Sequence, residues 1–240
     1  MNRIKVIFFD MGNTLLHFHY GDSDDEKDEK GLLYLTQYLN KFNSNITLEE
    51  VQTGFLDKWF EAIEDRGIKN IEYPIEDFFN EFLSKYNLEF TMEQCIEAIN
   101  LFYKEYREQV HFENNLYNLL KGIKEKGYKI GVVSNTCYYD EVMKECFKKA
   151  GIYDLVDKYT FSYSLRIGKP DTRIFKAAME EMKVLPEEII MVGDNLESDI
   201  KPASDLGMKT VWLNTNNKTN DVGIAPDFEI GSLEELINLI

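Results

Sequence analysis

Hydrophobic and polar positions follow two different patterns along this chain. A short apolar run at 4–9 stops at Asp10, which predicts a buried strand. Over about 31–110, apolar and aromatic residues recur at helical spacing, which indicates a bundle of amphipathic helices with an aromatic core. Capping-box sequences at 47–50 and 91–94 predict where two of these helices begin.

From about residue 115 the pattern changes to strands alternating with helices. Strands are predicted at 128–134, 189–192 and 210–213, and helices at 116–126, 139–150, 172–183 and from Ser232. Such alternation is typical of a parallel sheet with helices on both faces. We therefore expect the α/β class: a Rossmann-like parallel-sheet core at 1–16 and 115–240, and an α-helical cap domain at 17–114.

The segment 22–30 is polar and mainly acidic, and it lies between the first strand and the predicted helices. It could be mistaken for a calcium-binding loop. Lys27, however, stands where such a loop needs a glycine. We therefore interpret the segment as a solvated connector.

The net charge of the chain argues against some classes of binding partner. The chain has 240 residues, of which 27 are basic and 43 acidic, for a formal net charge of −16. Such a surface repels nucleic acid and anionic membranes. The chain shows no signal-peptide pattern and no apolar stretch of membrane-spanning length, and its three cysteines form no CxxC pair. A cytoplasmic protein is expected, and its oligomeric state is left open.

Polar residues follow several of the predicted strands, at the edge where parallel sheets bind ligands, and one more, Lys169, precedes a predicted helix. They are Asp10, Ser134, Asn135, Lys169, Asp194 and Asp199. Each alone has an ordinary structural explanation as a helix cap, a turn or a surface charge. Together they supply what phosphoryl transfer needs, namely carboxylates for Mg²⁺, donors for phosphate oxygens and a cation.

In these segments the chain resembles the haloacid dehalogenase superfamily. The segments read Asp10-Met11-Gly12-Asn13-Thr14, Val133-Ser134-Asn135, Gly168-Lys169-Pro170 and Gly193-Asp194-Asn195 through Asp199, and they occur in the order that the superfamily uses. The helical stretch between the first and second segments is similar to the cap that the superfamily inserts there.

The resemblance implies a role for each residue. Asp10 would be the nucleophile that becomes an aspartyl phosphate. Ser134 and Asn135 would bind the phosphoryl oxygens, and Lys169 would neutralise Asp10 and the phosphate. Mg²⁺ would be held by Asp10, the carbonyl of Gly12 and Asp194, with Asp199 close by or linked through water.

One position departs from the pattern. Phosphatases of the superfamily usually carry a second Asp, two residues after the nucleophile, which protonates the leaving alcohol. Here that position is Gly12. Because general acid–base catalysis is worth roughly 10²–10⁴-fold, phosphate monoester hydrolysis should be slow or restricted to good leaving groups. We expect a Mg²⁺-dependent phosphatase acting on a small phosphorylated metabolite.

Other readings stay open. A phosphonatase-like hydrolase of carbon–phosphorus bonds does not use the second Asp, but it needs a cap lysine for a Schiff base. The predicted cap contains Lys41, Lys58, Lys69, Lys85 and Lys104, and the sequence does not indicate which of them would form the Schiff base. A dehalogenase fits poorly, because metal-free dehalogenation does not call for Asp194 and Asp199. A non-catalytic, phosphate-binding or regulatory protein is the last alternative. His17 and His19 could replace the missing acid, although surface or hinge histidines are the simpler interpretation.

Overall fold

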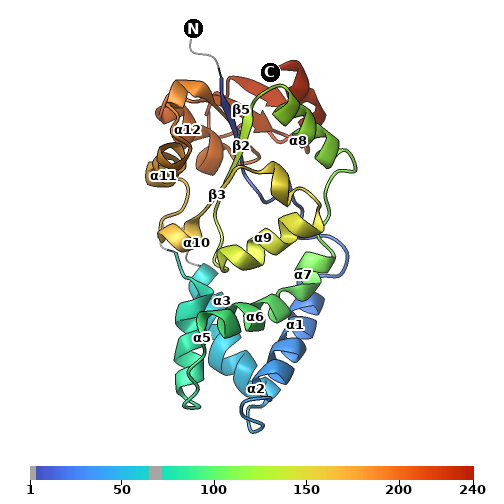
Figure 1. Cartoon of the computed structure of the whole chain (residues 1–240), viewed down its shortest axis with the longest axis vertical. Coiled ribbons are helices and arrows are strands. Elements are labelled where there is room, and N and C mark those ends of the chain that lie inside the picture. The colour runs from blue at the N-terminus through green and yellow to red at the C-terminus, as the bar shows by residue number, and fades with distance from the viewer. Residues whose placement is uncertain (1–3, 65–71) are drawn as a thin grey trace. The chain divides into compact units, whose positions relative to one another are not determined.

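The computed structural model describes residues 4–64 and 72–240, which form two compact units. The first, here called the core unit, takes in the chain up to His17, His111–Asn135 and Ala150–Ile240. The second, here called the helical unit, takes in the described residues of Phe18–Val110 together with Thr136–Lys149. Figure 1 shows the elements of both units.

The core unit is built on a six-stranded parallel sheet in the order β3-β2-β1-β4-β5-β6. The strands are β1 (Val6–Phe9), β2 (Lys129–Ser134), β3 (Lys158–Phe161), β4 (Ile189–Gly193), β5 (Lys209–Leu213) and β6 (Phe228–Ile230). β1 lies in the middle, between β2 and β4, so the direction of the strand order reverses beside it. Such a switch point opens a crevice at the carboxyl ends of the strands.

Helices cover both faces of this sheet, as the alternating pattern predicted. Figure 1 shows α11 (Thr172–Met182) and α12 (Lys201–Asp205) on one side and α8 (Leu116–Glu125) on the other. The remaining short elements are η2 (Tyr153–Leu155), α10 (Ser162–Leu165), η3 (Pro186–Glu188), η4 (Leu196–Ile200) and η5 (Leu233–Asn238). On the α11 side, fully buried Val6 and Phe8 pack with Ile174 and Phe175. The predicted α/β fold is confirmed.

The helical unit is organised around aromatic side chains. Its helices are α1 (Asp24–Leu39), α2 (Leu48–Val51), η1 (Gln52–Leu56), α3 (Asp57–Glu64), α5 (Ile75–Ser84), α6 (Met92–Phe102), α7 (Lys104–Glu108) and α9 (Asp140–Lys149). Phe55, Trp59, Phe79, Phe82 and Phe102 are all at most 1% exposed, so the aromatic stripes form a packed core. Both predicted capping boxes, at Thr47 and Thr91, are present.

The interpretation of 22–30 as a connector was wrong. Ser23 caps α1 through a capping box with Glu26, and Asp24, Asp25 and Glu26 occupy the first helical turn. Acidic side chains are favourable there, because the N-terminus of a helix carries partial positive charge. A polar run can therefore begin a helix as readily as it can form a loop.

Several smaller elements also differ from the prediction. β3, α10 and β6 were not anticipated, and the expected terminal helix is the 3₁₀ helix η5. α9 belongs to the helical unit, packing against α6 and α7, with an ion pair between Lys149 and Glu108. The sequence-based division into a hydrolase core at 1–16 and 115–240 and a cap at 17–114 stays a prediction.

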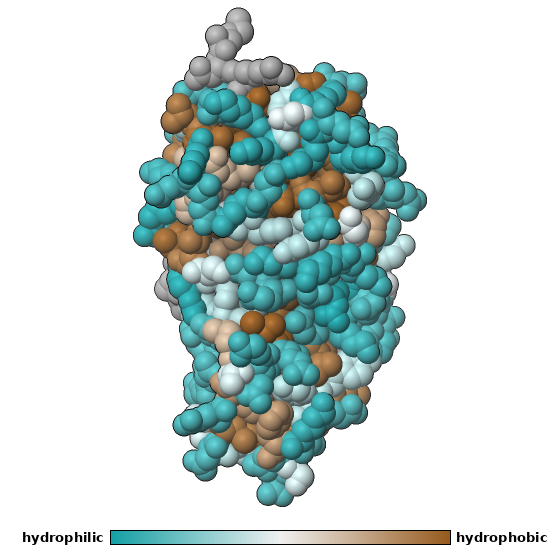
Figure 2. Space-filling model, in the orientation of Figure 1, coloured by the Kyte–Doolittle hydropathy of each residue, from teal (hydrophilic) through white to brown (hydrophobic). Residues whose placement is uncertain are grey.

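The surface in Figure 2 is largely polar. Hydrophilic residues cover most of the face shown in Figure 2, and hydrophobic ones form small separate groups. Within 4–64 and 72–240, no helix is both long and apolar enough to cross a membrane.

Candidate active site

Asp10 lies directly after β1, at the switch point of the sheet. Its backbone N–H donates to the carbonyl of Val192 at 3.0 Å, which continues the pairing of β1 with β4 by one residue. The chain then turns back on itself, with the N–H groups of Leu15 and Leu16 bonded to the carbonyl of Met11. Asn13 adopts a left-handed conformation with φ of 55° in this turn, a conformation that asparagine tolerates.

Lys169 is the cation at the centre of the site. Its Nζ donates to Oδ1 of Asp10 at 2.5 Å and to Oδ1 of Asp199 at 2.6 Å. The Ser134 hydroxyl, at the end of β2, donates to the same Asp10 oxygen at 2.9 Å. All four side chains are buried, so their charges interact with little screening by water. The predicted nucleophile, cation and hydroxyl thus lie together.

Asn135 holds Lys169 in place. Its Nδ2 donates to the Lys169 carbonyl at 2.7 Å, and its Oδ1 accepts the Lys169 N–H at 2.7 Å. This reciprocal pair fixes the backbone of Lys169 just before the cis bond to Pro170. The sequence suggested a contact with phosphate for Asn135 but not this positioning contact, because it joins two segments 34 residues apart.

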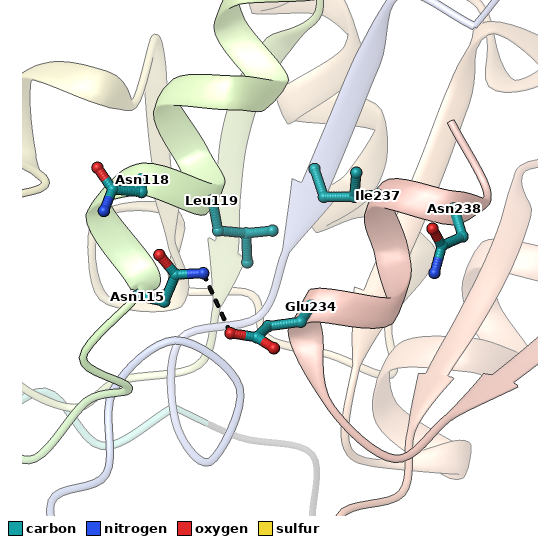
Figure 3. Close-up of a pocket in the computed structure, with 6 residues that line it drawn as sticks. All are labelled: Asn115, Asn118, Leu119, Glu234, Ile237 and Asn238. Atoms are coloured by element: carbon teal, nitrogen blue, oxygen red, sulfur yellow. Dashed lines mark hydrogen bonds between the residues drawn. The ribbon is translucent and has the colours of Figure 1, made fainter.

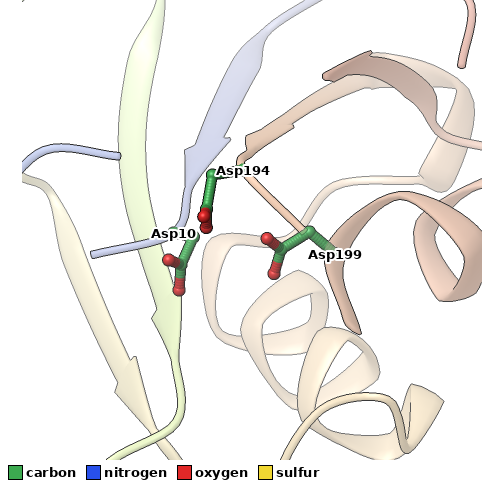
Figure 4. A group of neighbouring side chains, drawn as sticks. All are labelled: Asp10, Asp194 and Asp199. Carbon is green, nitrogen blue, oxygen red and sulfur yellow. The ribbon is translucent and has the colours of Figure 1, made fainter. Parts of the chain in front are cut away.

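Asp10, Asp194 and Asp199 form an acidic cluster. A ligand oxygen of each lies within 4.8 Å of the others, and Figure 4 shows the three side chains converging from the ends of β1 and β4 and from η4. A donor set of carboxylate oxygens, without cysteine or histidine, suits a hard divalent cation such as Mg²⁺. Gly12 lies two residues after Asp10 and forms an isolated bridge with Leu16.

The segment that carries Asp194 and Asp199 depends on two residues that sequence reasoning did not single out. A Cβ on Gly193 would lie 2.3 Å from Oδ2 of Asp199, so only glycine leaves room for this carboxylate. Asn195 caps η4 by accepting from the N–H groups of Glu197 and Ser198, and its own N–H donates to Asp199. The Gly-Asp-Asn sequence indicated a turn, but the sequence alone could not show that the buried carboxylate of Asp199 packs against Gly193.

Burial and charge shift the pKa values of these groups. Burial alone would lower the pKa of Lys169, but the carboxylates of Asp10 and Asp199 more than offset it, and the pKa is raised. Burial raises the pKa of Asp194, and the negative charge of Asp10 acts in the same direction. Burial also raises the pKa of Asp199, against the effect of Lys169. A cation among these carboxylates would relieve their repulsion.

The two histidines near the first segment have separate partners. His17 and His111 exchange backbone hydrogen bonds of 2.8 and 3.0 Å where the chain leaves and re-enters the core unit. Burial, followed by the charge of His111, lowers the pKa of His17. His19 belongs to the helical unit, and its Nδ1 lies 2.6 Å from Oδ2 of Asp24.

The described part of the core unit has hollows on its surface. One of about 240 Å³ borders Asp194 and is lined also by Asn195, Trp212 and Lys218. The Nζ of Lys218 is 3.9 Å from Oδ2 of Asp194. Another, of about 310 Å³, is drawn in Figure 3 and lies between the start of α8 and η5. There Asn115 donates to Glu234 at 3.1 Å, and none of its lining residues belongs to the acidic cluster.

Comparison with known proteins identifies the family to which this protein belongs. The family model described as haloacid dehalogenase-like hydrolase matches residues 23–213. Since this is well over half of the chain, the protein belongs to this family and is a hydrolase. The expected membership of this family is thereby confirmed.

Similar proteins include several phosphatases. Glyceraldehyde 3-phosphate phosphatase of Methanocaldococcus jannaschii is 29% identical over 99% of this chain and 97% of its own length. Pyrimidine 5′-nucleotidase YjjG of Escherichia coli is 31% identical, over 52% of this chain and 54% of its own. Phosphoserine phosphatase of Thermus thermophilus is 28% identical, over 60% of this chain and 57% of its own length.

Solved structures share the fold. A phosphatase of the haloacid dehalogenase family from Thermococcus onnurineus aligns with a TM-score of 0.64 and 23% identity, over 98% of this chain and 97% of that one. A 2-haloacid dehalogenase from Pseudomonas syringae aligns with a TM-score of 0.67 and 22% identity, over 98% of this chain and 97% of that one. Because phosphatases and dehalogenases both match, the fold alone does not select the reaction.

Proposed function

We propose that this protein is a Mg²⁺-dependent phosphatase that hydrolyses small phosphate esters through an aspartyl phosphate on Asp10. The observation that carries the proposal is the shared hydrogen bonding of Asp10 to Lys169 and Ser134 beside the acidic cluster. A dehalogenase would have no evident use for that cluster. Two relatives that align with most of the chain are named glyceraldehyde 3-phosphate phosphatase, which supports the same choice.

In this proposal the residues have separate tasks. Oδ1 of Asp10 is held by Lys169 and Ser134, so the other oxygen is the one directed at phosphorus. Attack by Asp10 forms the oxygen–phosphorus bond of an aspartyl phosphate and breaks the phosphorus–oxygen bond of the ester, so the leaving group departs as an anion and takes a proton from water. Water then hydrolyses this intermediate and regenerates the carboxylate. Lys169 and the Ser134 hydroxyl neutralise and orient the phosphoryl oxygens.

Asp10, Asp194 and Asp199, with the Gly12 carbonyl, are the groups proposed to hold Mg²⁺. The bound ion would neutralise part of the charge of a phosphate dianion. This matters in a protein of net charge −16, which otherwise repels an anionic substrate. Lys169 alone cannot balance three carboxylates and a phosphate.

Gly12 sets the expected substrate preference. A glycine cannot protonate the departing group, so phosphorylated compounds whose leaving groups are stable anions should react best. Aryl and acyl phosphates belong to this group, whereas simple alkyl phosphates do not. The names of the relatives suggest three-carbon phosphates, pyrimidine nucleotides and phosphoserine as further compounds to test.

The phosphonatase alternative has less support. Its Schiff-base lysine should be desolvated, so that its amine is neutral and reactive. Lys41, Lys58 and Lys85 are exposed, Lys104 is partly exposed, and Lys69 lies outside the described residues. Lys27 of the helical unit is fully buried, but its ammonium is engaged by the carbonyl of Phe18 at 3.0 Å.

The test is a panel of phosphate esters, acyl phosphates and phosphonates assayed with and without Mg²⁺. We expect phosphate release from aryl and acyl phosphates that requires Mg²⁺ and is absent in Asp10→Asn. Cleavage of phosphonates only, or metal-independent release, would contradict the proposal.

A further inference from the structure

Trp212 makes a direct contact with the backbone of Asp194. It lies on β5, where it pairs in register with Gly193 of the neighbouring strand β4. Its indole Nε1–H donates to the Asp194 carbonyl at 3.0 Å, and its side chain is only 3% exposed. The indole is a donor with a single N–H, so this bond uses its whole hydrogen-bonding capacity.

The ring of Trp212 also supports the turn that carries Asp199. It forms a small apolar cluster with Leu196 and Ile200, the first and last residues of η4, and partly buried Ile224 packs against it. Asp199 lies within η4. One side chain on β5 therefore contacts the segment that carries Asp194 and Asp199 in two places. Its N–H donates to the carbonyl of Asp194, and its ring packs against the turn that contains Asp199.

We propose that Trp212 is a positioning residue for the acidic cluster, which sets the orientation of Asp194 and Asp199 for cation binding. This inference rests on the proposed binding of Mg²⁺ by these carboxylates. Groups that orient metal ligands contribute to affinity without touching the ion. A buried tryptophan N–H would need an acceptor in any case, so the experiment must separate positioning from a purely structural role.

The chain contains a matched control. Of its two tryptophans, Trp59 is also buried, and its Nε1–H also donates to a backbone carbonyl, that of Tyr73 at 2.9 Å. Trp59 belongs to the helical unit, where its ring packs against those of Phe60 and Tyr138. Trp212→Phe and Trp59→Phe therefore remove the same kind of hydrogen bond. The first loses its bond to Asp194, and the second loses its bond to Tyr73 in the helical unit.

The test is calorimetric titration of Mg²⁺ into the parent, Trp212→Phe, Trp59→Phe and Asp194→Asn, with the unfolding temperature of each measured alongside. We expect Trp212→Phe to weaken Mg²⁺ binding by about 3- to 10-fold, and Trp59→Phe to leave it unchanged. With an aryl phosphate, the Mg²⁺ concentration for half-maximal rate should rise in Trp212→Phe, while kcat at saturating Mg²⁺ stays within about twofold of the parent.

A lowered unfolding temperature with parental Mg²⁺ affinity in Trp212→Phe would overturn the inference. If Asp194→Asn loses binding in the same series, the metal site itself still stands. Equal Mg²⁺ affinity in the parent and Asp194→Asn would overturn the metal site and the positioning role together. As a check that keeps Trp212 intact, its fluorescence in Trp59→Phe should change on adding Mg²⁺, and an unchanged spectrum would count against the inference.

Discussion

The Nζ atom of Lys169 lies 2.5 Å from Oδ1 of Asp10, and the two side chains are only 3% and 10% exposed. The same Nζ atom lies 2.6 Å from Oδ1 of Asp199, whose side chain is 1% exposed. Removing the cation would leave two buried carboxylates facing each other, which is costly in a medium of low dielectric constant.

Lys169→Met should therefore lower kcat strongly, by about 10²-fold or more. Methionine keeps most of the apolar stem, so the loss isolates the charge from the packing. Lys201→Met is the control, since Lys201 is exposed and pairs with Asp205 of its own helix. Steady-state kinetics with an aryl phosphate measure both, and a Lys169→Met variant with more than half of the parental kcat would exclude the proposed role.

Gly12→Asp should raise the rate with alkyl phosphates by about 10²-fold, by restoring a general acid. The structure permits this change, because a Cβ at Gly12 meets nothing within 4 Å and its φ lies outside the positive range that favours glycine. Gly12→Asn is the control of matched shape without an acid, and it should show no gain. Equal rates on alkyl and aryl phosphates in the parent would contradict this account of Gly12.

Gly193→Ala should displace the Asp199 carboxylate, since the new Cβ would lie 2.3 Å from Oδ2 of Asp199. We expect a loss of about 1–3 kcal/mol in the free energy of unfolding, together with weaker Mg²⁺ activation. Gly122→Ala in α8 is the control. Its Cβ would meet nothing within 4 Å, so it should stabilise the protein by roughly 0.5–1 kcal/mol. Denaturant titration compares the two, and a neutral Gly193→Ala would show that the segment can shift freely.

Asp28 gives stability a dependence on pH. Burial raises its pKa from 3.8 to about 6, against the hydrogen bond from Tyr106. The folded state thus favours the protonated carboxyl, and the resulting stability is full below pH 3.8 and is lost as pH rises through about 6. Asp28→Asn should be more stable than the parent at pH 8 by on the order of 1 kcal/mol, after discounting for solvent screening.

That advantage should shrink as pH falls to 5. Glu29→Gln removes the same charge from an exposed position of the same helix and serves as the control. Denaturant unfolding at the two pH values measures the difference, and an advantage that does not depend on pH would assign it to something other than the titration of Asp28.

Local rules predicted the features that local chemistry determines. The capping boxes at Thr47 and Thr91 start helices as expected, and the run that ends at Asp10 is a buried central strand. β6, with three residues, is too short to stand out from the pattern, and the contact of Asn135 with Lys169 depends on a crossover between strands. The steric need for glycine at position 193 was not foreseen, because the carboxylate that occupies this space comes six residues later.

The most direct test of the proposed mechanism is to trap the phosphorylated enzyme. The parent is mixed with an aryl phosphate and Mg²⁺, quenched in acid within a turnover, digested and examined by mass spectrometry. Because Gly12 places no base to activate water against the intermediate, the account predicts a phosphoryl group on Asp10 in the parent. Asp10→Asn should carry none and should not turn over. Phosphate release by Asp10→Asn at the parental rate, or a phosphoryl group on another residue, would contradict the account.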